Sequence, residues 1–449
     1  MTKNTGNLQM HIGFDDTDST KHGCTTYVAA LLVERLEQLG VTFLDYPRLV
    51  RLNPNVPWKT RGNGALCLTL QTDPELEADI KECTIDLVEE HSDLNSKGTN
   101  PGIVFLTANA VPTEIAAFAK KAETEIVTLK EALNLIRTFH AEALGYNTRR
   151  GIIGALAAIG EPLTADHTYE LIAYRTKENL GTKRRVNEVS ISQMDNALQP
   201  YTFNNVDLET KRVVITPRGP DPILFGIRGE TAQTVKQAFG MVEALEPVER
   251  WVIFRSNQGT DMHLKPVSSL SQAQPYSSVV AKGTVSRAPE VVPVRHVIFG
   301  MKDSTAEVDC AAYEPTGELR KIARELVVGD EIKVCGAVRK PHADKPLTLN
   351  LEKIDVLKLA TKTEPQNPLC PNCGKRLKSM GKNQGFRCEK CKSRFQTLQK
   401  AQVAKQRCLQ TGLYVTSTRS QRHLTKPLRR YGLEKHGANG VELLAGWHS

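Results

Sequence analysis

Two closely spaced cysteine pairs constrain the fold of this chain more than any other feature of its sequence. Two residues separate Cys370 from Cys373, and fourteen residues further on Cys388 and Cys391 repeat the spacing. Each pair spans a tight turn that directs two thiolates at one ion, and four thiolates complete a tetrahedral shell with no open position. The pattern therefore predicts a structural Zn²⁺ site in a zinc ribbon over residues 365–398.

Length and composition describe the rest of the chain. Its 449 residues, 40% of them hydrophobic and 24% charged, exceed one ordinary core, so we expect three or four domains. No run is apolar enough to cross a bilayer and the N-terminus has no apolar signal core, which favours a cytoplasmic protein without a membrane partner. A reduced protein also suits the scattered positions of the other cysteines, which are Cys24, Cys67, Cys83, Cys310, Cys335 and Cys408.

Positive charge is concentrated at the C-terminal end. Residues 365–449 contain 17 Lys and Arg against 3 Asp and Glu, a net charge of +14, whereas the other 364 residues carry a net charge of −5. Such an asymmetry indicates a polyanionic partner bound at that end, and residues 399–449 are expected to form a basic nucleic-acid-binding segment. A basic tail that only aids solubility is the alternative reading.

The first 140 residues alternate between strand and helix patterns. Met10–Phe14 reads as a buried strand, and Thr25–Leu39 as a helix whose N-cap is Thr25 or Thr26. Further strands and a helix follow, and a capping box at Thr128 begins a helix expected to end near Gly145. This alternation predicts an α/β domain over residues 8–140.

Two more domains precede the zinc ribbon, which makes the predicted fold class multidomain α+β. Interleaved strands and helices over residues 141–265 suggest a ferredoxin-like domain. Residues 276–358 show five short strands with a helix, Glu318–Leu326, between the third and the fourth, which is the order of an OB-fold barrel. The five expected strands are Val279–Ser286, Val291–Phe299, Ala306–Tyr313, Glu331–Val338 and Leu347–Val356.

Three carboxylates end the first strand and are the strongest catalytic candidates. Asp15, Asp16 and Asp18 lie within four residues, where they repel one another unless a cation compensates. Mg²⁺ prefers such oxygen ligands and shares them with phosphates, and the helix that begins near Thr25 directs its free amides at the same place. A solvated Asp-rich turn is the alternative.

A short basic loop supplies the complementary charges. Lys59 and Arg61 precede Gly62-Asn63-Gly64, whose backbone amides can approach an anion closely. A hairpin turn with solvated charges has the same sequence features, and the loop is no Walker A motif because no Gly-Lys-Ser/Thr follows.

In this order the motifs resemble those of the archaeal tRNA 2-agmatinylcytidine (agmatidine) synthetases. The resemblance is carried by residues 15–19, 23–27, 53–55 and 59–64, then by residues 217–222 and 257–261, the OB segment and the ribbon. It covers nearly the whole chain, and the set of motifs is far more specific than any one of them.

The resemblance implies a defined reaction. An ATP-dependent carbon–nitrogen ligase would phosphorylate the 2-carbonyl of the wobble cytidine in the isoleucine tRNA with anticodon CAU, and agmatine would displace the phosphate, which changes decoding to AUA. The family's first domain is a kinase-like domain that autophosphorylates a threonine, and the motif match places that threonine at Thr25. Asp15, Asp16 and Asp18 would hold Mg²⁺, and Lys59, Arg61, Gly62, Asn63 and Gly64 would bind ATP.

The sequence does not assign the residues that bind agmatine. Agmatine needs carboxylates, for which Asp221 and Asp261 are candidates that no sequence pattern assigns. No protein partner is predicted. Two other functions remain possible: a non-catalytic single-strand-binding protein built from OB and ribbon modules, and a tRNA-modifying ligase that uses a different amine.

Overall fold

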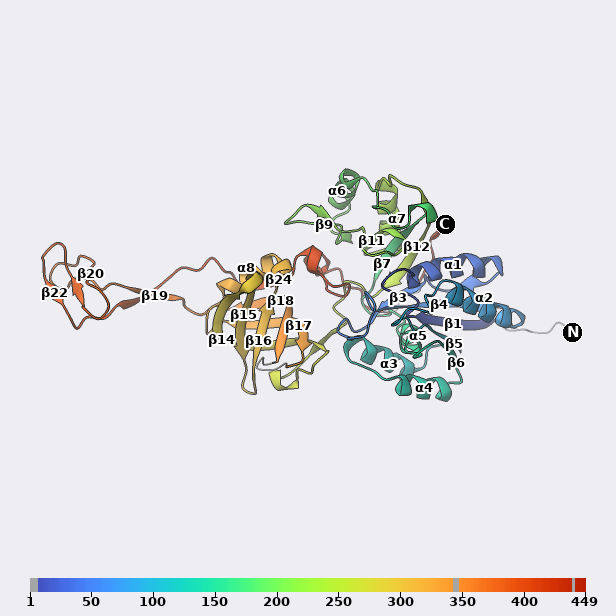
Figure 1. The fold of residues 1–449 in the computed structure, drawn as a ribbon, viewed down its shortest axis with the longest axis horizontal. Helices are drawn as coiled ribbons and strands as arrows, with labels where there is room; N and C mark the ends of the chain where they lie inside the picture. Colours follow the sequence, from blue (N-terminus) through green and yellow to red (C-terminus); the bar gives the residue numbers. More distant parts are fainter. Residues whose placement is uncertain (1–6, 342–346, 438–440) are drawn as a thin grey trace.

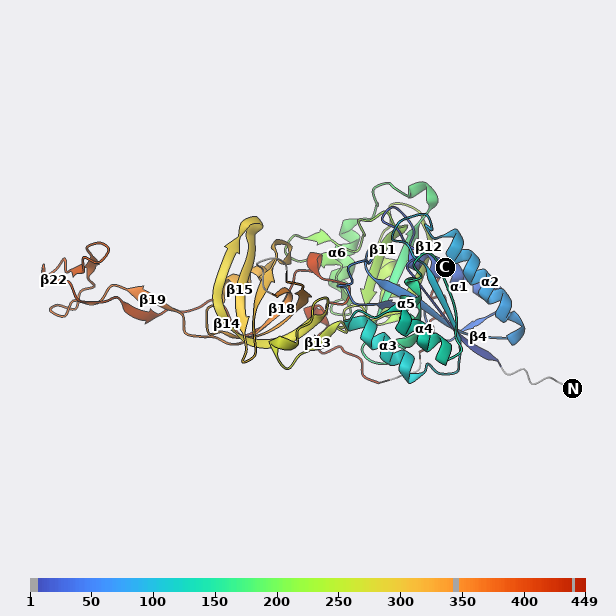
Figure 2. The ribbon, with the colours of Figure 1, turned by 60° about the horizontal axis from the view of Figure 1, so that its bottom comes forward.

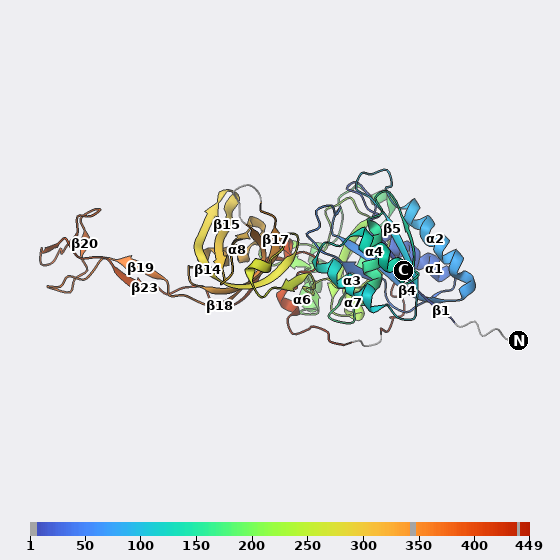
Figure 3. The ribbon, with the colours of Figure 1, turned by 90° about the horizontal axis from the view of Figure 1, so that it is seen from below.

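The computed structural model describes residues 7–341, 347–437 and 441–449. An α+β body, a β-barrel and a small zinc ribbon follow one another along the long axis of the molecule (Figure 1). The ribbon lies at the far end of a thin two-stranded stalk, β19 (Thr363–Gln366) and β23 (Ala401–Ala404), in every view (Figures 1 and 3). None of the helices in these ranges is long and apolar enough to cross a membrane.

One sheet of ten strands runs through the whole α+β body. Its order is β6-β5-β1-β4-β3-β12-β7-β11-β8, with β2 paired to β4. The first half contributes β1 (Leu8–Asp15), β2 (Thr42–Phe43), β3 (Arg48–Arg51), β4 (Gly64–Thr72), β5 (Gly102–Thr107) and β6 (Glu142–Gly145). The second half contributes β7 (Thr168–Arg175), β8 (Thr202–Phe203), β11 (Ile223–Gly229) and β12 (Val248–Ser256). Because β3 and β12 pair in parallel, the two halves share a continuous sheet.

Helices cover both faces of the first half (Figure 2). Alternate residues of β4 point to opposite sides, with Leu66 and Leu68 in one core and Cys67 in the other. The first core is completed by α1 (Thr25–Gln38) and α2 (Glu77–Glu90), and the second by α3 (Thr113–Thr124), α4 (Leu129–Thr138) and α5 (Gly151–Gly160). In the second half, α6 (Glu188–Ala197) and α7 (Ala232–Met241) contribute to a further core.

Two expected helix boundaries are wrong. The helix that starts at the Thr128 capping box ends at Thr138 and not near Gly145, because the chain turns at His140, whose φ is +52°, and then pairs with β5 as edge strand β6. The N-cap of α1 is Cys24, which makes no side-chain capping hydrogen bond. Thr25 is therefore the first helical residue, and its hydroxyl is not used as a cap.

The next part of the chain is a closed barrel. Its strands are β14 (Ser278–Val292), β15 (His296–Lys302), β16 (Glu307–Ala312), β17 (Glu331–Arg339) and β18 (Thr348–Lys358), and α8 (Glu318–Glu325) lies between the third and fourth strands in sequence. They pair in the order β14-β15-β16-β18-β17, and β17 pairs again with β14. Strand β14 runs past its expected end to Val292, so β15 is shorter than expected and starts at His296 instead of Val291, while the order of strands and helix is the predicted one.

The C-terminal segment that the structure describes packs back onto the rest of the chain. Strand β24 (Gly412–Val415) pairs with β18 of the barrel, and the chain then returns to the α+β body. Trp447 packs edge-on against Phe43 and Tyr46, and its carbonyl accepts a hydrogen bond from the Ile253 amide at 3.1 Å. Cations of this segment such as Arg407, Arg419 and Arg430 form ion pairs with Asp330, Asp207 and Asp166.

Candidate functional site

A cavity of about 380 Å³ opens in the α+β body where β1 ends and β4 begins. The antiparallel pairing of these two strands sets Phe14 opposite Leu66, so the residues after β1 lie beside those before β4. The eight residues predicted to bind ATP and Mg²⁺ and the predicted phosphorylation site all line this one cavity: Asp15, Asp16, Asp18, Lys59, Arg61, Gly62, Asn63 and Gly64, and Thr25.

The carboxylates of Asp15 and Asp16 lie in strongly unfavourable surroundings for negative charge. Burial, and next the neighbouring Asp16, hold the pKa of Asp15 well above its usual value. Burial also raises the pKa of Asp16 to about 6, despite a 3.2 Å hydrogen bond from Asn100 Nδ2. Gly154 makes the close packing possible, because a Cβ there would collide with the Asp15 carboxylate. A cation in the cavity would relieve this repulsion.

Arg61 binds carboxylates in this structure. Its Nε donates to Asp18 Oδ2 at 2.6 Å and its Nη1 to Asp221 Oδ2 at 3.3 Å, while Nη2 donates to the Gly23 carbonyl at 2.6 Å. The guanidinium thus joins the carboxylate cluster, the start of α1 and the 217–222 loop. It orders the cavity wall instead of standing free to receive an anion.

The glycines of the basic loop lie close to the half-buried Arg51. A Cβ at Gly62 or Gly64 would come within 2.7 or 2.8 Å of Arg51 Nη1, so a larger residue at either position would displace this guanidinium. Asn63 has a φ of +45° and donates from Nδ2 to the Asn53 carbonyl at 2.7 Å, which fixes the turn. Lys59 is exposed beside the loop. Packing against Arg51 and Asn53 therefore determines the conformation of the loop. A hairpin turn with only solvated side chains would not require such packing.

Thr25 occupies the first position of α1 with its side chain 8% exposed. Its Oγ1 lies 3.1 Å from Thr17 Oγ1, which donates to it. The first amides of a helix have no acceptor within the helix, and they attract negative charge. The hydroxyl therefore lies where a phosphate group would be stabilised.

Sequence reasoning missed several residues of the cavity wall. The apolar stretch from Gly151 forms helix α5, whose first turn also borders the cavity and supplies a second helix N-terminus. Arg51, Arg150 and His423 line the cavity too. In the sequence, the charged run Arg149-Arg150-Gly151 is a weak indication of the helix N-terminus at α5. Nothing local marks His423, which comes from the C-terminal return.

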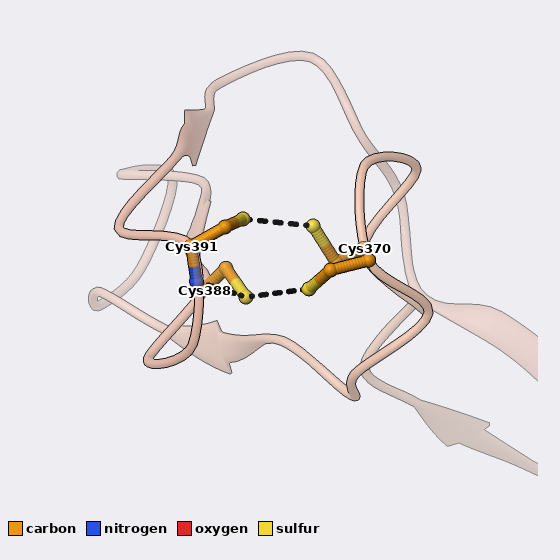
Figure 4. A group of neighbouring side chains, drawn as sticks. Cys370, Cys388 and Cys391 are labelled. Carbon is orange, nitrogen blue, oxygen red and sulfur yellow. Dashed lines mark hydrogen bonds between the residues drawn. The ribbon is translucent and has the colours of Figure 1, made fainter.

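The four ribbon cysteines form a separate site (Figure 4). Their Sγ atoms all lie within 4.8 Å of one another. Cys370 Sγ lies 3.5 Å from Cys391 Sγ, and Cys373 Sγ lies 3.4 Å from Cys388 Sγ. Four converging thiols on two short turns suit one tetrahedral ion such as Zn²⁺.

We expect one tightly bound zinc ion per chain and its loss in Cys388→Ser, because a hydroxyl replaces one of four thiolate ligands. Metal analysis of the freshly purified protein measures this. Cys408→Ser is the matched control, since Cys408 is exposed and lies outside the four-cysteine group. Equal zinc content in the wild-type and Cys388→Ser proteins would contradict the assignment.

Fold and site together define a multidomain α+β protein that combines a cavity of clustered carboxylates and cations with a separate zinc ribbon. Family models match three parts of the chain: the TiaS TCKD domain at residues 11–148, the TiaS FLD domain at 149–263 and the TiaS C-terminal zinc ribbon domain at 367–409. The chain belongs to the TiaS family.

Full-length relatives agree with this assignment. The isoleucine-tRNA 2-agmatinylcytidine synthetases TiaS of Methanocaldococcus jannaschii and Methanosarcina acetivorans are both 42% identical, each over 94% of this chain and over 99% and 97% of their own lengths. A solved complex of TiaS with its isoleucine tRNA and ATP aligns with a TM-score of 0.85 and 38% identity, covering 97% of this chain and 99% of that one. A complex of TiaS with the same tRNA, AMPCPP and agmatine aligns with a TM-score of 0.83 and 37% identity, covering 94% and 97%.

Proposed function

We propose that this chain is an ATP-dependent tRNA ligase. It phosphorylates the 2-carbonyl of the wobble cytidine in the isoleucine tRNA with anticodon CAU and attaches agmatine there, giving agmatidine and AUA decoding in the cytoplasm. The observation that carries the proposal is the cavity at the end of β1, where a carboxylate cluster and a glycine loop meet in a chain matched over 94% of its length by agmatidine synthetases.

Within the cavity, Asp15, Asp16 and Asp18 would hold Mg²⁺, which neutralises phosphate charge during transfer. Lys59 and the amides of Gly62, Asn63 and Gly64 would bind phosphate oxygens of ATP. The N-termini of α1 and α5 add positive potential on the same wall. We assign Arg61 a double role, as the partner of two carboxylates here and as a phosphate ligand when ATP enters.

The domain labels follow from the same proposal. Residues 8–140 act as a kinase-like domain and residues 141–265 as a ferredoxin-like domain. The closed barrel is an OB fold that contacts tRNA, and Zn²⁺ holds the ribbon in shape. A cytosine carbonyl oxygen is a poor leaving group, and its phosphorylation lets an amine displace it, which is why ATP and agmatine share one site.

Of the two carboxylates considered for agmatine, Asp221 is the better placed. It lines the cavity, where it contacts Arg61 and Arg184. Asp261 instead forms an ion pair with Lys353 of the barrel and accepts a 2.7 Å hydrogen bond from the Lys426 amide, so it fixes the joint between domains.

Mass spectrometry of the wobble nucleoside tests the function. The protein is incubated with ATP, agmatine and an unmodified transcript, and agmatidine is expected only when all three are present. A second arm replaces agmatine with another diamine or polyamine. Incorporation of that amine alone would favour a different ligase, and tRNA binding without any modification would favour a non-catalytic binding protein.

We expect Thr25 to carry phosphate after incubation with ATP alone, because its hydroxyl lines the cavity at a helix N-terminus. Phosphopeptide mapping measures the site. Thr25→Val should abolish the label, whereas Thr26→Val, at the next position of the same wall, should keep it. Label on any residue other than Thr25 would refute the assignment.

A further inference from the structure

The indole of Trp58 stands at the mouth of the cavity. Its side chain is 46% exposed and lies on the turn between β3 and β4. It lines the same cavity as Asp15 and Asp16, and none of the other described residues that line it is a Phe, Tyr or Trp. A large flat apolar surface is thus presented at the entrance to the proposed reaction site.

Arg150 links this ring to the carboxylates. Its guanidinium carbon lies 5.6 Å from the ring centroid, and burial raises the pKa of Asp16 while the charge of Arg150 acts in the opposite direction. Its Nε is buried and has no hydrogen-bond partner within the part of the chain that the structure describes. Arg150 therefore lies over the indole ring and near the carboxylate cluster, with a donor that lacks an acceptor among the described residues.

A second hollow of about 590 Å³ adjoins the first and shares Lys59, Gly62 and His423 of its wall. Lys59, Arg339 and Arg422 line it, and no carboxylate is found among its described lining residues. Partial burial, and then the charges of Arg422 and Arg339, lower the pKa of Lys59, so the three cations lie close together. Arg422 also forms an ion pair with Glu352, whose Oε1 lies 3.5 Å from its Nε, and the positive charge left in excess suits phosphates that need no metal ion.

Trp58 lines the first cavity, and its chain neighbours Pro57 and Lys59 line the second. A positively charged groove beside an exposed aromatic ring is how proteins hold single-stranded nucleic acid: the groove follows the phosphates and the ring stacks a base. A base that reacts must first leave the stack of its own strand. ATP would bring its phosphates to the carboxylates and needs no second, metal-free phosphate site.

We propose that Trp58 is the platform on which the extruded wobble cytosine stacks, while Lys59, Arg339 and Arg422 hold phosphates of the same RNA strand. The proposal rests on the proposed function and assigns Trp58 as a positioning residue. Stacked there, the base lies with Arg150 between it and the carboxylate cluster, where the phosphoryl group would be transferred.

A double-mutant cycle tests the stacking. Affinities of wild-type protein and Trp58→Leu are measured for a tRNA transcript and for the same transcript with an abasic wobble position. Trp58→Leu should bind the intact transcript roughly 5- to 100-fold more weakly, whereas both proteins should bind the abasic one equally. Trp58→Phe, which keeps an aromatic ring, should bind the intact transcript nearly as wild type does. Equal loss on both transcripts would overturn the proposal.

Two further readouts distinguish the wobble base from adenine and place the strand. If Trp58→Leu weakens binding of an ATP analogue without tRNA and shows no coupling to the wobble base, the ring stacks adenine and the proposal is wrong. Arg339→Gln should make the log–log salt slope of tRNA binding shallower by roughly 1, and an unchanged slope would remove Arg339 from the strand path. If wild-type protein forms agmatidine but the double-mutant cycle shows no coupling between Trp58 and the wobble base, the stacking role of Trp58 is wrong and the proposed function stands. If wild-type protein forms no agmatidine, the proposed function is wrong.

Discussion

Asp16→Asn should reduce ATP cleavage by roughly a thousandfold or more while the protein stays folded. The substitution removes one negative charge from the group proposed to hold Mg²⁺. Asparagine has nearly the same size, tolerates the left-handed backbone at this position, where φ is +61°, and can still accept the hydrogen bond from Asn100. The measurement is ATP turnover with tRNA and agmatine present.

Stability gives an independent check on the same variant. Because burial raises the pKa of Asp16, the ionised carboxylate costs folding free energy at neutral pH, and this cost disappears in Asp16→Asn. The melting temperature should therefore be unchanged or higher. Asp86→Asn is the matched control, since Asp86 is exposed on α2 and should change neither turnover nor stability. Near-normal turnover by well-folded Asp16→Asn would remove the metal assignment.

The parts of this site that the sequence predicted are those encoded by neighbouring residues. The carboxylates at the end of β1 and the glycines before β4 each form a local pattern. Their meeting depends on one antiparallel pairing, which puts the end of β1 beside the start of β4. The zinc ribbon was predictable for the same reason, since each pair of ligands is fixed by its own turn.

The parts that could not be predicted depend on long-range packing without a local pattern. The parallel pairing of β3 with β12 sets Arg48 beside Arg255, far along the chain, and merges two expected domains into one sheet. Trp58 has the sequence context of an ordinary turn residue, and only the folded structure places it in the cavity wall. Helix α5 is apolar on every side because it is buried, so its sequence shows no amphipathic period.

The C-terminal return shows how charge composition alone can mislead. Arg430 is 0% exposed, and it donates to Glu230 Oε1 at 2.5 Å and to Asp166 Oδ1 at 2.8 Å. Arg429 forms an ion pair with Asp195. These arginines count toward the basic excess of the C-terminal end, yet they are already neutralised by acidic side chains of the α+β body. The ribbon is the part of the basic end whose cations remain largely exposed.

Removal of residues 412–449 should therefore unfold the α+β body or lower its melting temperature severely. The deletion takes Trp447 out of a core in which it is 7% exposed and leaves Glu230 and Asp166 without their buried partner. Losses of a buried tryptophan and of one partner of a buried ion pair each cost about 3–5 kcal/mol, against a typical total stability of about 5–15 kcal/mol. Thermal unfolding measures the effect, and a cooperative melt like that of wild type would contradict it.

Replacing residues 367–400 with a two-residue Asn-Gly turn should leave the stability of the fold unchanged and weaken tRNA binding. Gln366 and Ala401 are cross-strand neighbours in the stalk, so a short hairpin turn closes it without strain. The fold should survive, and label on Thr25 from ATP alone should persist. The replaced segment carries nine Lys and Arg and one Glu. If half a dozen of these cations bind phosphate, the log–log salt slope of tRNA binding becomes shallower by roughly 4 to 5. An unchanged slope would leave tRNA binding to the barrel and the α+β body.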